Sequence, residues 1–352
     1  MKKLIYVLLF LSVWITGCIP TTPVGGGIPP VNTAKNLSLI AFGSCCNQAL
    51  DMGIYNSIRE KKPDLYIEEG DNIYSDYYPN TDPTAFLNLL NTNYQTKAKN
   101  VFWKRLRDSI PIIATWDDHD YGRNNAGAEF PFKTQSKSAF LTFWNEPAVS
   151  ERRNHDGLYT SYYFGDDAHK VQIIMLDMRT FLNVISPEPI TPTTDTTKNM
   201  LGATQWAWFK AELLKPAKIR IIASSSQFGP QSDGWEGWFN YPHEQERMYN
   251  ALKDAHAEGA FIISGDVHYS EISQRTSPGL YPLYDFTSSG LTHKENALAA
   301  NSYRVGTGFA DLNFAMIRID WNASPVTITF ETYNKPGTLV RQMAINLDDL
   351  KF

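Results

Sequence analysis

Cysteine is scarce in this chain. Only three occur in 352 residues, and two of them, Cys45 and Cys46, are adjacent. A vicinal pair could form only a strained disulfide, so the sequence excludes the disulfide framework typical of small secreted domains. A thiol at this position therefore invites another role, either as a metal ligand or as a small buried side chain.

The chain also lacks an excess of positive charge. Its 32 Lys and Arg residues are outnumbered by 37 Asp and Glu residues, which gives a formal net charge of −5. General nucleic-acid binding requires a basic face, so this composition argues against it. A phosphorylated substrate is not excluded, because bound metal ions can reverse the local electrostatic field.

An apolar run occurs at the very start of the chain. It spans Leu4 to Ile15, follows two lysines and is too short to cross a bilayer. It ends in Ile15-Thr16-Gly17-Cys18, which resembles a lipobox, in which the Cys is lipidated after cleavage. We therefore expect residues 1–18 to be a lipoprotein signal peptide with Cys18 lipidated. An ordinary cleaved signal and an uncleaved anchor are the alternatives.

This expectation places the protein in the cell envelope, anchored to a membrane through Cys18 and either periplasmic or on the outer surface. Residues 19–36 are rich in Pro, Gly and Thr and show no periodicity, so we expect a flexible tether. Residues 37–352 show no internal repeat and no further change of composition. We expect them to form one domain and the protein to be a monomer.

Short β-rich runs alternate with amphipathic helical stretches along this domain, which predicts a layered α/β fold. The Pro- and Thr-rich segment 186–198 is expected to be a surface loop without a catalytic role. The tail from 314 to 345 alternates like antiparallel strands. Strands are expected at 37–43, 65–68, 110–115, 159–164, 171–176, 220–223 and 261–263, and helices at 52–60, 86–106, 134–145, 204–214 and 244–256.

Polar or metal-capable side chains follow five of these strands at their carboxyl ends. Ligands of open α/β sheets bind beyond such ends, so we expect the five segments to meet in one crevice. A single Asp there is commonly only a helix N-cap, but five such ends together indicate a site. The segments are Ser44-Cys45-Cys46-Asn47-Gln48, Gly70-Asp71-Asn72-Ile73-Tyr74, Trp116-Asp117-Asp118-His119-Asp120, Ser226-Gln227 and Ser264-Gly265-Asp266-Val267-His268.

The side chains in these segments indicate a metal site. Carboxylates and imidazoles suit a hard or borderline divalent cation, and a thiolate or phenolate adds a preference for iron. Close carboxylates without cations would repel one another and raise their pKa values. Paired cations would relieve this repulsion, clamp a phosphate and activate water. The sequence therefore predicts a metal-dependent phosphoric ester hydrolase.

These segments, in this order, resemble the signatures of the PhoD-like (alkaline phosphatase D) metallophosphatases. The resemblance covers nearly the whole domain, without the extra N-terminal β-domain of many relatives. It implies a four-layer α/β/β/α fold and a phosphomonoesterase or phosphodiesterase that uses Fe(III) and Ca(II), or another pair of metals. The matching motifs are Gly43-Ser44-Cys45, Gly70-Asp71-Asn72-Ile73-Tyr74, Trp116-Asp117-Asp118-His119 with Asn124-Asn125, Asp233-Gly234-Trp235 with Glu246-Arg247, and Gly265-Asp266-Val267-His268.

The resemblance also implies two metal sites that share one carboxylate. Asp71 occupies the Gly-Asp turn and would bridge the two ions, which makes it catalytic. The first ion, Fe(III), would take three further ligands: Cys45, Tyr74 and His268. The second ion, calcium, would take two: Asp118 and Asp266. On chemistry alone Cys46 remains an alternative to Cys45, and Tyr74 could instead pack at the crevice wall.

The remaining candidates would contact the substrate. His119 stands where related enzymes place the His that protonates the leaving oxygen or binds the phosphate, and Gln227 where they often place another ligand. Arg123 suits bidentate phosphate contact, although a surface Arg is the alternative, and Asn124 and Asn125 could bind substrate oxygens.

The substrate class itself stays open. It could be a phosphorylated small molecule, a lipid or a polymer. A phospholipase D-type, teichoic-acid or nucleotide phosphodiesterase is the first alternative. A non-catalytic, metal-stabilised surface binding lipoprotein is the second. The aromatic loop 228–241 could roof the crevice or belong to the core, and the remaining histidines, including His293, are expected at the surface or at helix caps.

Overall fold

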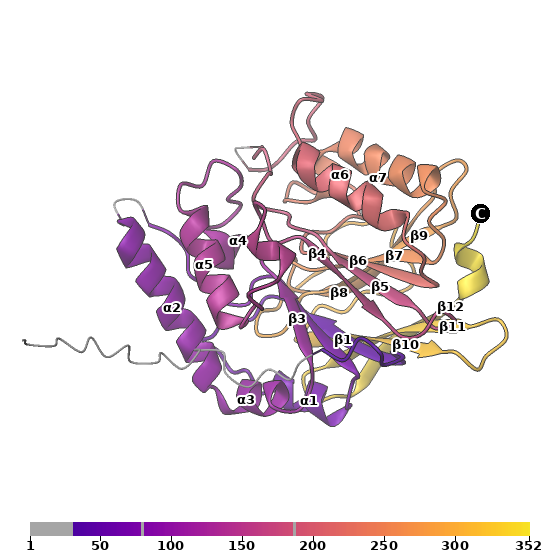
Figure 1. Cartoon of the computed structure of the whole chain (residues 1–352), viewed down its shortest axis with the longest axis horizontal. Helices are drawn as coiled ribbons and strands as arrows, with labels where there is room; N and C mark the ends of the chain where they lie inside the picture. Colours follow the sequence, from indigo (N-terminus) through magenta and orange to yellow (C-terminus); the bar gives the residue numbers. More distant parts are fainter. Residues whose placement is uncertain (1–30, 79–80, 186–187) are drawn as a thin grey trace, which may run out of the picture.

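The computed structural model describes residues 31–78, 81–185 and 188–352 (Figure 1). The expected signal peptide, its Cys18 and most of the expected tether lie outside these residues. Among the helices that are described, none combines the length and the apolar character needed to cross a bilayer.

Two six-stranded mixed sheets form the centre of the molecule. In the first, β1 to β3 run parallel to one another, and in the second β5, β6, β7 and β9 do so. The first sheet has the order β12 (Leu339–Asn346), β11 (Thr327–Asn334), β10 (Asn313–Asp320), β1 (Leu39–Gly43), β2 (Leu65–Glu69) and β3 (Ile112–Thr115). The second has the order β4 (Thr160–Phe164), β5 (Val171–Met175), β6 (Ile219–Ser224), β7 (Ala260–Ser264), β9 (Leu283–Ser288) and β8 (Ser270–Arg275).

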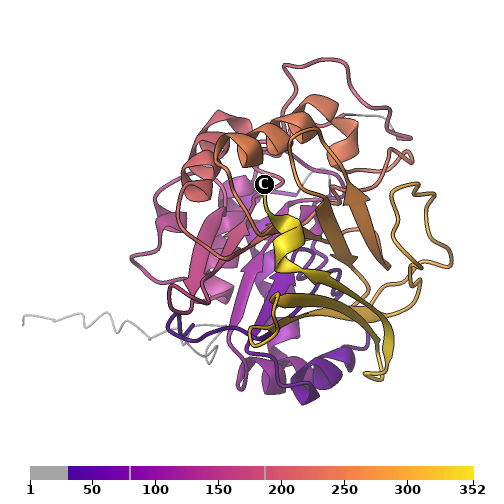
Figure 2. The same ribbon diagram turned by 90° about the vertical axis from the view of Figure 1, so that its right-hand side faces the viewer.

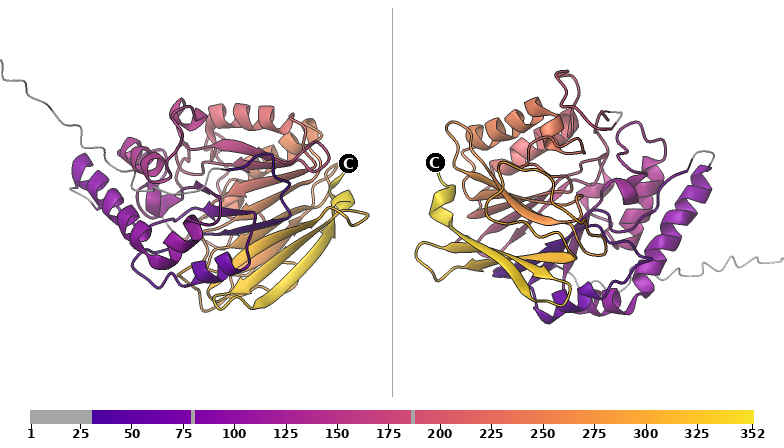
Figure 3. Two further views of the ribbon diagram at one scale, coloured as in Figure 1. Left: turned by 60° about the horizontal axis from the view of Figure 1, so that its bottom comes forward. Right: turned by 180° about the vertical axis from the view of Figure 1, so that it is seen from behind.

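Helices cover the outer face of each sheet, and the four layers expected from the family resemblance are present (Figure 3). The first sheet is covered by α1 (Ile54–Glu60), α2 (Pro83–Lys99), α3 (Val101–Arg107) and α5 (Lys133–Phe143), with the short α4 (Asp118–Tyr121) before α5. The second is covered by α6 (Gly202–Leu213) and α7 (Pro242–Asp254). Short 3-10 turns lie at Glu151–Arg153, Trp238–Asn240 and, next to the C-terminus, Leu347–Leu350 (Figure 2).

The layers follow from strands that are apolar on both faces. In β1, Ile40 and Phe42 pack into the core between the sheets, whereas Ala41 packs into the core under the outer helices. A strand buried on both faces needs a continuous apolar run, which is why the sequence shows no alternation here.

Two expectations need correction. The single helix expected at 86–106 is two helices, because Asn100 leaves the helical conformation and its side chain accepts hydrogen bonds from Phe102 and Trp103 as the cap of α3. The strands β8 and β9 were not expected, because β8 reads Ser-Glu-Ile-Ser-Gln-Arg and carries little apolar signal.

Candidate active site

The turns that follow the strands carry the candidate ligands in an unusual backbone conformation. Cys45, Asp71, Asp266 and His268 have φ values of 62°, 49°, 77° and 59°. Non-glycine residues rarely adopt this left-handed region, and they do so mainly at functional sites where the surrounding structure holds them there. Four of the predicted ligands therefore have a strained backbone conformation, which is typical of functional sites.

Two glycines allow the turns of the two sheets to meet. Gly70 has a φ of 97°, and a Cβ there would lie 2.7 Å from Asp117 Cβ and 3.0 Å from Ser225 Cβ. A Cβ on Gly265 would likewise collide with Ser44 Oγ and would lie 3.0 Å from the Ser225 carbonyl oxygen. The absence of a side chain at these positions brings the carboxyl ends of β2, β3, β6 and β7 together.

One group of predicted ligands surrounds Asp71. Its Oδ2 lies 3.4 Å from Cys45 Sγ and 3.2 Å from the Tyr74 hydroxyl, which in turn lies 3.3 Å from His268 Nε2. The thiol of Cys45 also lies 3.1 Å from Ser289 Oγ. The neighbouring Cys46 lies elsewhere, in the apolar core under the outer helices.

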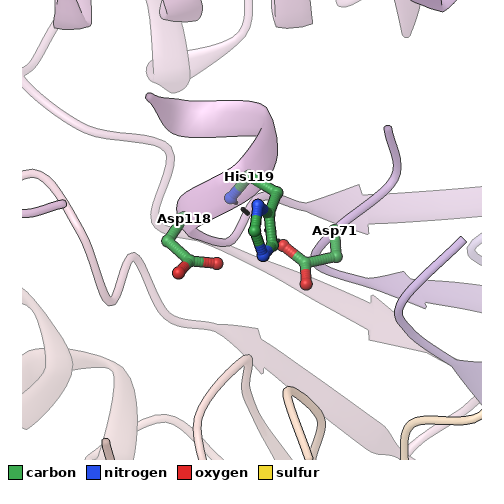
Figure 4. Close-up of side chains that lie close together, drawn as sticks. All are labelled: Asp71, Asp118 and His119. Carbon is green, nitrogen blue, oxygen red and sulfur yellow. Dashed lines mark hydrogen bonds between the residues drawn. The ribbon is translucent and has the colours of Figure 1, made fainter. Parts of the chain in front are cut away.

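A second group adjoins the first. The ligand atoms of Asp71, Asp118 and His119 lie within 4.8 Å of one another (Figure 4). Those of Asp117, Asp118 and Asp266 also lie within 4.8 Å of one another. Asp71 thus belongs to both groups, which is the arrangement that a bridging carboxylate requires. Asp117 is an addition that the family resemblance did not assign.

His119 is held in place from three sides. Its backbone N–H donates to Asp71 Oδ1 at 3.3 Å, and its Nδ1 lies 2.8 Å from Asp76 Oδ1. Its ring stacks on Tyr74 with the centroids 4.2 Å apart. A carboxylate at Nδ1 fixes the orientation of the ring and leaves Nε2 as the nitrogen free for chemistry.

The electrostatics of the groups reflect crowded negative charge. Burial, together with neighbouring acidic groups, raises the pKa of Asp71 and of Asp266 well above the ordinary value and the pKa of Cys45 to about 12. Burial opposes the charged form of His119, but Asp71 and Asp118 outweigh it and raise its pKa to about 11. Burial also opposes ionisation of Asp118, yet the charge of Arg179 lowers its pKa.

The groups fit metal ions. Asp118 Oδ1 and Asp117 Oδ2 are buried, and no hydrogen-bond partner for either occurs in the described part of the chain. Buried carboxylate oxygens are rarely left without a partner, so these two atoms fit the role of cation ligands. The donors comprise carboxylates, an imidazole, a thiol and a phenol, a set that suits one softer and one harder ion. The structure thus provides candidate acidic and histidine metal sites.

A buried ion pair beside the cluster escaped the sequence analysis. Arg179 is fully buried, donates to Asp117 and lies 2.5 Å from Glu236 Oε2. A signal for it existed, because Asp177 and Arg179 directly follow the strand at 171–176 and make a sixth polar strand end.

His293 was also missed, since we expected it at the surface or at a helix cap. Its ring lies 4.7 Å from that of Tyr74 and 5.0 Å from that of His268, and it is only partly exposed. It thus continues a wall of rings along the first group.

The predicted substrate-contacting residues lie at different depths. The Asn125 N–H donates to Asp118 Oδ2 at 2.6 Å, and the Asn124 N–H donates to Asp76 Oδ1 at 3.0 Å. Arg123 is exposed, with Nη2 3.7 Å from Glu129 Oε1. Gln227 is buried, and its amide group donates to Glu271 and Thr287 rather than to the cluster. Whether any of these residues binds substrate stays a prediction.

The aromatic loop 228–241 divides between its two expected roles. Trp238, Phe239 and Tyr241 are buried, so these rings belong to the core. Trp235 is 60% exposed and remains free to meet a ligand.

Comparisons with known proteins agree with this architecture. Alkaline phosphatase D of Bacillus subtilis (strain 168) is 25% identical over 328 residues, which cover 80% of this chain. The match takes in 54% of that protein, so the chain spans about half the length of the curated relative. A solved structure of PhoD superposes with a TM-score of 0.64 at 18% identity, covering 90% of this chain and 73% of that one.

A second solved structure, GAP50, the anchor in the inner membrane complex of Plasmodium, superposes with a TM-score of 0.54 at 15% identity. The match covers 89% of each chain, so this likeness concerns the fold. The model of the PhoD-like phosphatases matches residues 40–299, which include the turns after β1, β2, β3 and β7. The chain therefore belongs to the PhoD-like phosphatase family.

Proposed function

We propose that this chain is an extracytoplasmic, metal-dependent hydrolase of phosphate esters. The observation that carries the proposal is the convergence of buried acidic, thiol, phenol and imidazole groups from separate strand ends onto Asp71. Such a group repels itself without cations and would hold two of them a few ångströms apart. Membership of a phosphatase family and the relation to alkaline phosphatase D support the choice of reaction.

The donor sets support an assignment of the ions. Cys45, Tyr74 and His268 would hold Fe(III), because thiolate and phenolate suit iron, and Asp118 with Asp266 would hold calcium, which prefers oxygen. Asp71 would bridge the two. When bound, the cations would withdraw charge from the phosphate and lower the pKa of water.

The residues of the chain perform the remaining tasks. Asp76 orients the His119 ring, and stacking on Tyr74 limits its rotation. The Asp76 carboxylate at Nδ1 also stabilises the protonated ring, so His119 can donate a proton from Nε2 to the leaving oxygen as the P–O bond breaks. Removal of that proton donor affects esters of weakly acidic alcohols most.

Two other functions compete with this one. A phosphodiesterase acting on lipid, teichoic-acid or nucleotide diesters would use the same groups, and comparing an aryl monoester with the matching diester separates the two reactions. A non-catalytic surface binding lipoprotein would need the metals only for stability. The completeness of the two groups argues against this, because a site without chemistry would not need His119 poised between Asp76 and Asp71.

The test is hydrolysis of an aryl phosphate by the metal-loaded protein and by Asp71→Ala. The variant should lose activity by about a thousandfold or more and retain less metal, since both ions depend on one carboxylate. Asp167→Ala, at a side chain that is 98% exposed in the turn between β4 and β5, serves as the matched control and should keep full activity. Unchanged turnover by Asp71→Ala would refute the proposal.

The location of the protein is a separate part of the proposal. A lipid on Cys18 would tether the domain to a membrane and confine its substrates to the outside of the cytoplasm. Cys18→Ala should move the full-length protein from the detergent phase to the aqueous phase. If the wild-type protein and the Cys18→Ala variant partitioned equally, the lipid anchor would be contradicted, whereas the proposed hydrolase activity would be unaffected.

A further inference from the structure

A pocket of about 570 Å³ opens next to the candidate cluster. One wall is the segment 123–125, which follows α4. The opposite wall is the segment 182–184 together with Lys198. Lys198 belongs to the Pro- and Thr-rich stretch that the sequence analysis expected to be a surface loop without a catalytic role.

Hydrogen bonds fix the first wall to the candidate catalytic groups. The Asn125 N–H donates to Asp118 at 2.6 Å. The Asn124 N–H donates to the same Asp76 oxygen that lies 2.8 Å from His119 Nδ1. The pocket therefore adjoins the cluster at Asp118, a candidate metal ligand, and at Asp76, which orients the His119 ring from its Nδ1 side.

The lining of the pocket suits a polar organic group. Leu182, Val184 and Ala128 supply an apolar part, and Asn124 and Lys198 supply hydrogen-bond donors. The Lys198 ammonium donates to the Val184 carbonyl oxygen at 3.3 Å. A few polar groups around an apolar floor are typical of small-molecule sites of this volume.

The charges around the pocket are balanced. Arg123 lies 3.7 Å from Glu129, and the Asn125 amide donates to Glu188. The pocket thus offers donors and acceptors without a strong net charge. This composition favours a neutral, hydroxyl-rich group over an aliphatic chain or a second phosphate.

We propose that this pocket receives the organic group of the ester, a hydroxyl-rich alcohol portion about the size of a monosaccharide. The inference rests on the proposed hydrolysis of phosphate esters and adds the substrate class. The volume of the pocket greatly exceeds what inorganic phosphate needs, and its wall is bonded to Asp118, so the organic group of a phosphate ester held at the cluster would lie within reach of it. Lys198 and Asn124 would be specificity-determining residues.

The experiment fills the pocket with a larger side chain and measures how the metal-loaded enzyme binds two ligands, a sugar phosphate and inorganic phosphate. Val184→Trp should raise the KM for glucose 6-phosphate by about tenfold with little change in kcat, because it blocks binding of the sugar and leaves the chemistry intact. The inhibition constant of inorganic phosphate, which needs only the metal cluster, should change by less than about twofold. Val149→Trp, at a position 92% exposed and outside the pocket lining, is the matched control and should leave both constants unchanged.

Lys198→Met gives an independent arm if the tryptophan variant does not fold. It should raise the KM for glucose 6-phosphate and spare phosphate inhibition. An unchanged KM in both variants, or an equal loss of sugar phosphate and inorganic phosphate binding, overturns the inference. So does a wild-type enzyme that hydrolyses phenyl phosphate but not glucose 6-phosphate. Failure to hydrolyse any ester would instead refute the proposed function.

Discussion

Arg179 donates its Nε–H to a carboxylate oxygen of Asp117, and neither side chain is appreciably exposed. The same guanidinium contacts Glu236, so one cationic side chain pairs with two buried carboxylates. Because Asp117 immediately precedes Asp118, this ion pair anchors the turn that carries a candidate ligand. Its charge also lowers the pKa of Asp118 against the effect of burial, which keeps that carboxylate ionised and available.

Arg179→Met should therefore be strongly destabilising. The substitution leaves Asp117 and Glu236 buried without a counter-ion, and breaking a buried pair from one side typically costs about 3–5 kcal/mol. Urea unfolding of the metal-free protein measures this change in the free energy of unfolding. Lys104→Met removes an exposed ion pair with Asp108 and should cost less than about 1 kcal/mol. Similar losses in the two variants would contradict a special role for the buried pair.

Gly70→Ala should abolish activity, and Gly306→Ala should not. Both glycines have positive φ values, 97° and 71°, so both substitutions cost about 1 kcal/mol in backbone strain. They differ in space, because a Cβ on Gly70 would meet Asp117 and Ser225, whereas nothing lies within 4 Å of a Cβ on Gly306. The alanine at 70 should push apart the turns after β2 and β3.

The measurement for this pair is metal content and aryl phosphate turnover after purification. An active Gly70→Ala enzyme with full metal content would show that the close approach of the turns is not required for the site.

The two cysteines provide a matched pair of substitutions. Cys45 lies in the candidate cluster and Cys46 in the apolar core, although they are neighbours in sequence. If Cys45 holds iron as proposed, Cys45→Ala should lower the iron content and the activity by about tenfold or more, because the proposed iron site loses one of its ligands. Cys46→Ala should lower the free energy of unfolding by about 1 kcal/mol and leave the metal content unchanged. The reverse pattern would assign the metal to Cys46.

Local signals in the sequence predict a layered α/β fold and the meeting of strand ends, whereas the number of layers came from the family resemblance. Apolar runs such as Leu65 to Ile67 define strands, and carboxyl ends of parallel strands share an edge. The meeting of the segment 44–48 with Asp71 follows from that rule, whereas the choice of Cys45 over Cys46 came from the family resemblance. β1, β2 and β3 are indeed parallel neighbours in one sheet.

Local signals in the sequence do not predict contacts between distant segments. Asp76 binds His119 across 43 positions, and His293 reaches Tyr74 from a loop after β9. Nothing in the local composition of these residues distinguishes them from surface groups. The pocket lined by Lys198 could not be predicted for the same reason, because residues of separate loops form it together.

The acidic cluster should make the stability of the metal-free protein depend on pH. The pKa values of Asp71 and Asp266 are raised well above 3.8 in the folded state, so the folded protein holds protons that the unfolded chain has released. The contribution of these groups to stability is therefore fully present below about pH 4 and is lost as the pH rises through their folded pKa values. Metal-free protein should accordingly melt at a lower temperature at pH 8 than at pH 6.

Asp71→Asn isolates this effect. The amide cannot ionise, so at pH 8 the substitution should raise the melting temperature of the metal-free protein by a few degrees. This corresponds to a gain of about 1–2 kcal/mol in the free energy of unfolding. At acidic pH the melting temperature should change little. Adding Fe(III) and Ca(II) should then stabilise the wild type strongly and the variant weakly, because binding to the folded state alone shifts the unfolding equilibrium. Thermal unfolding with and without metal at both pH values gives all four comparisons. A metal-free Asp71→Asn protein less stable than the wild type at pH 8 would mean that the carboxylate is compensated within the chain, and the case for a cation between these groups would lose its electrostatic basis.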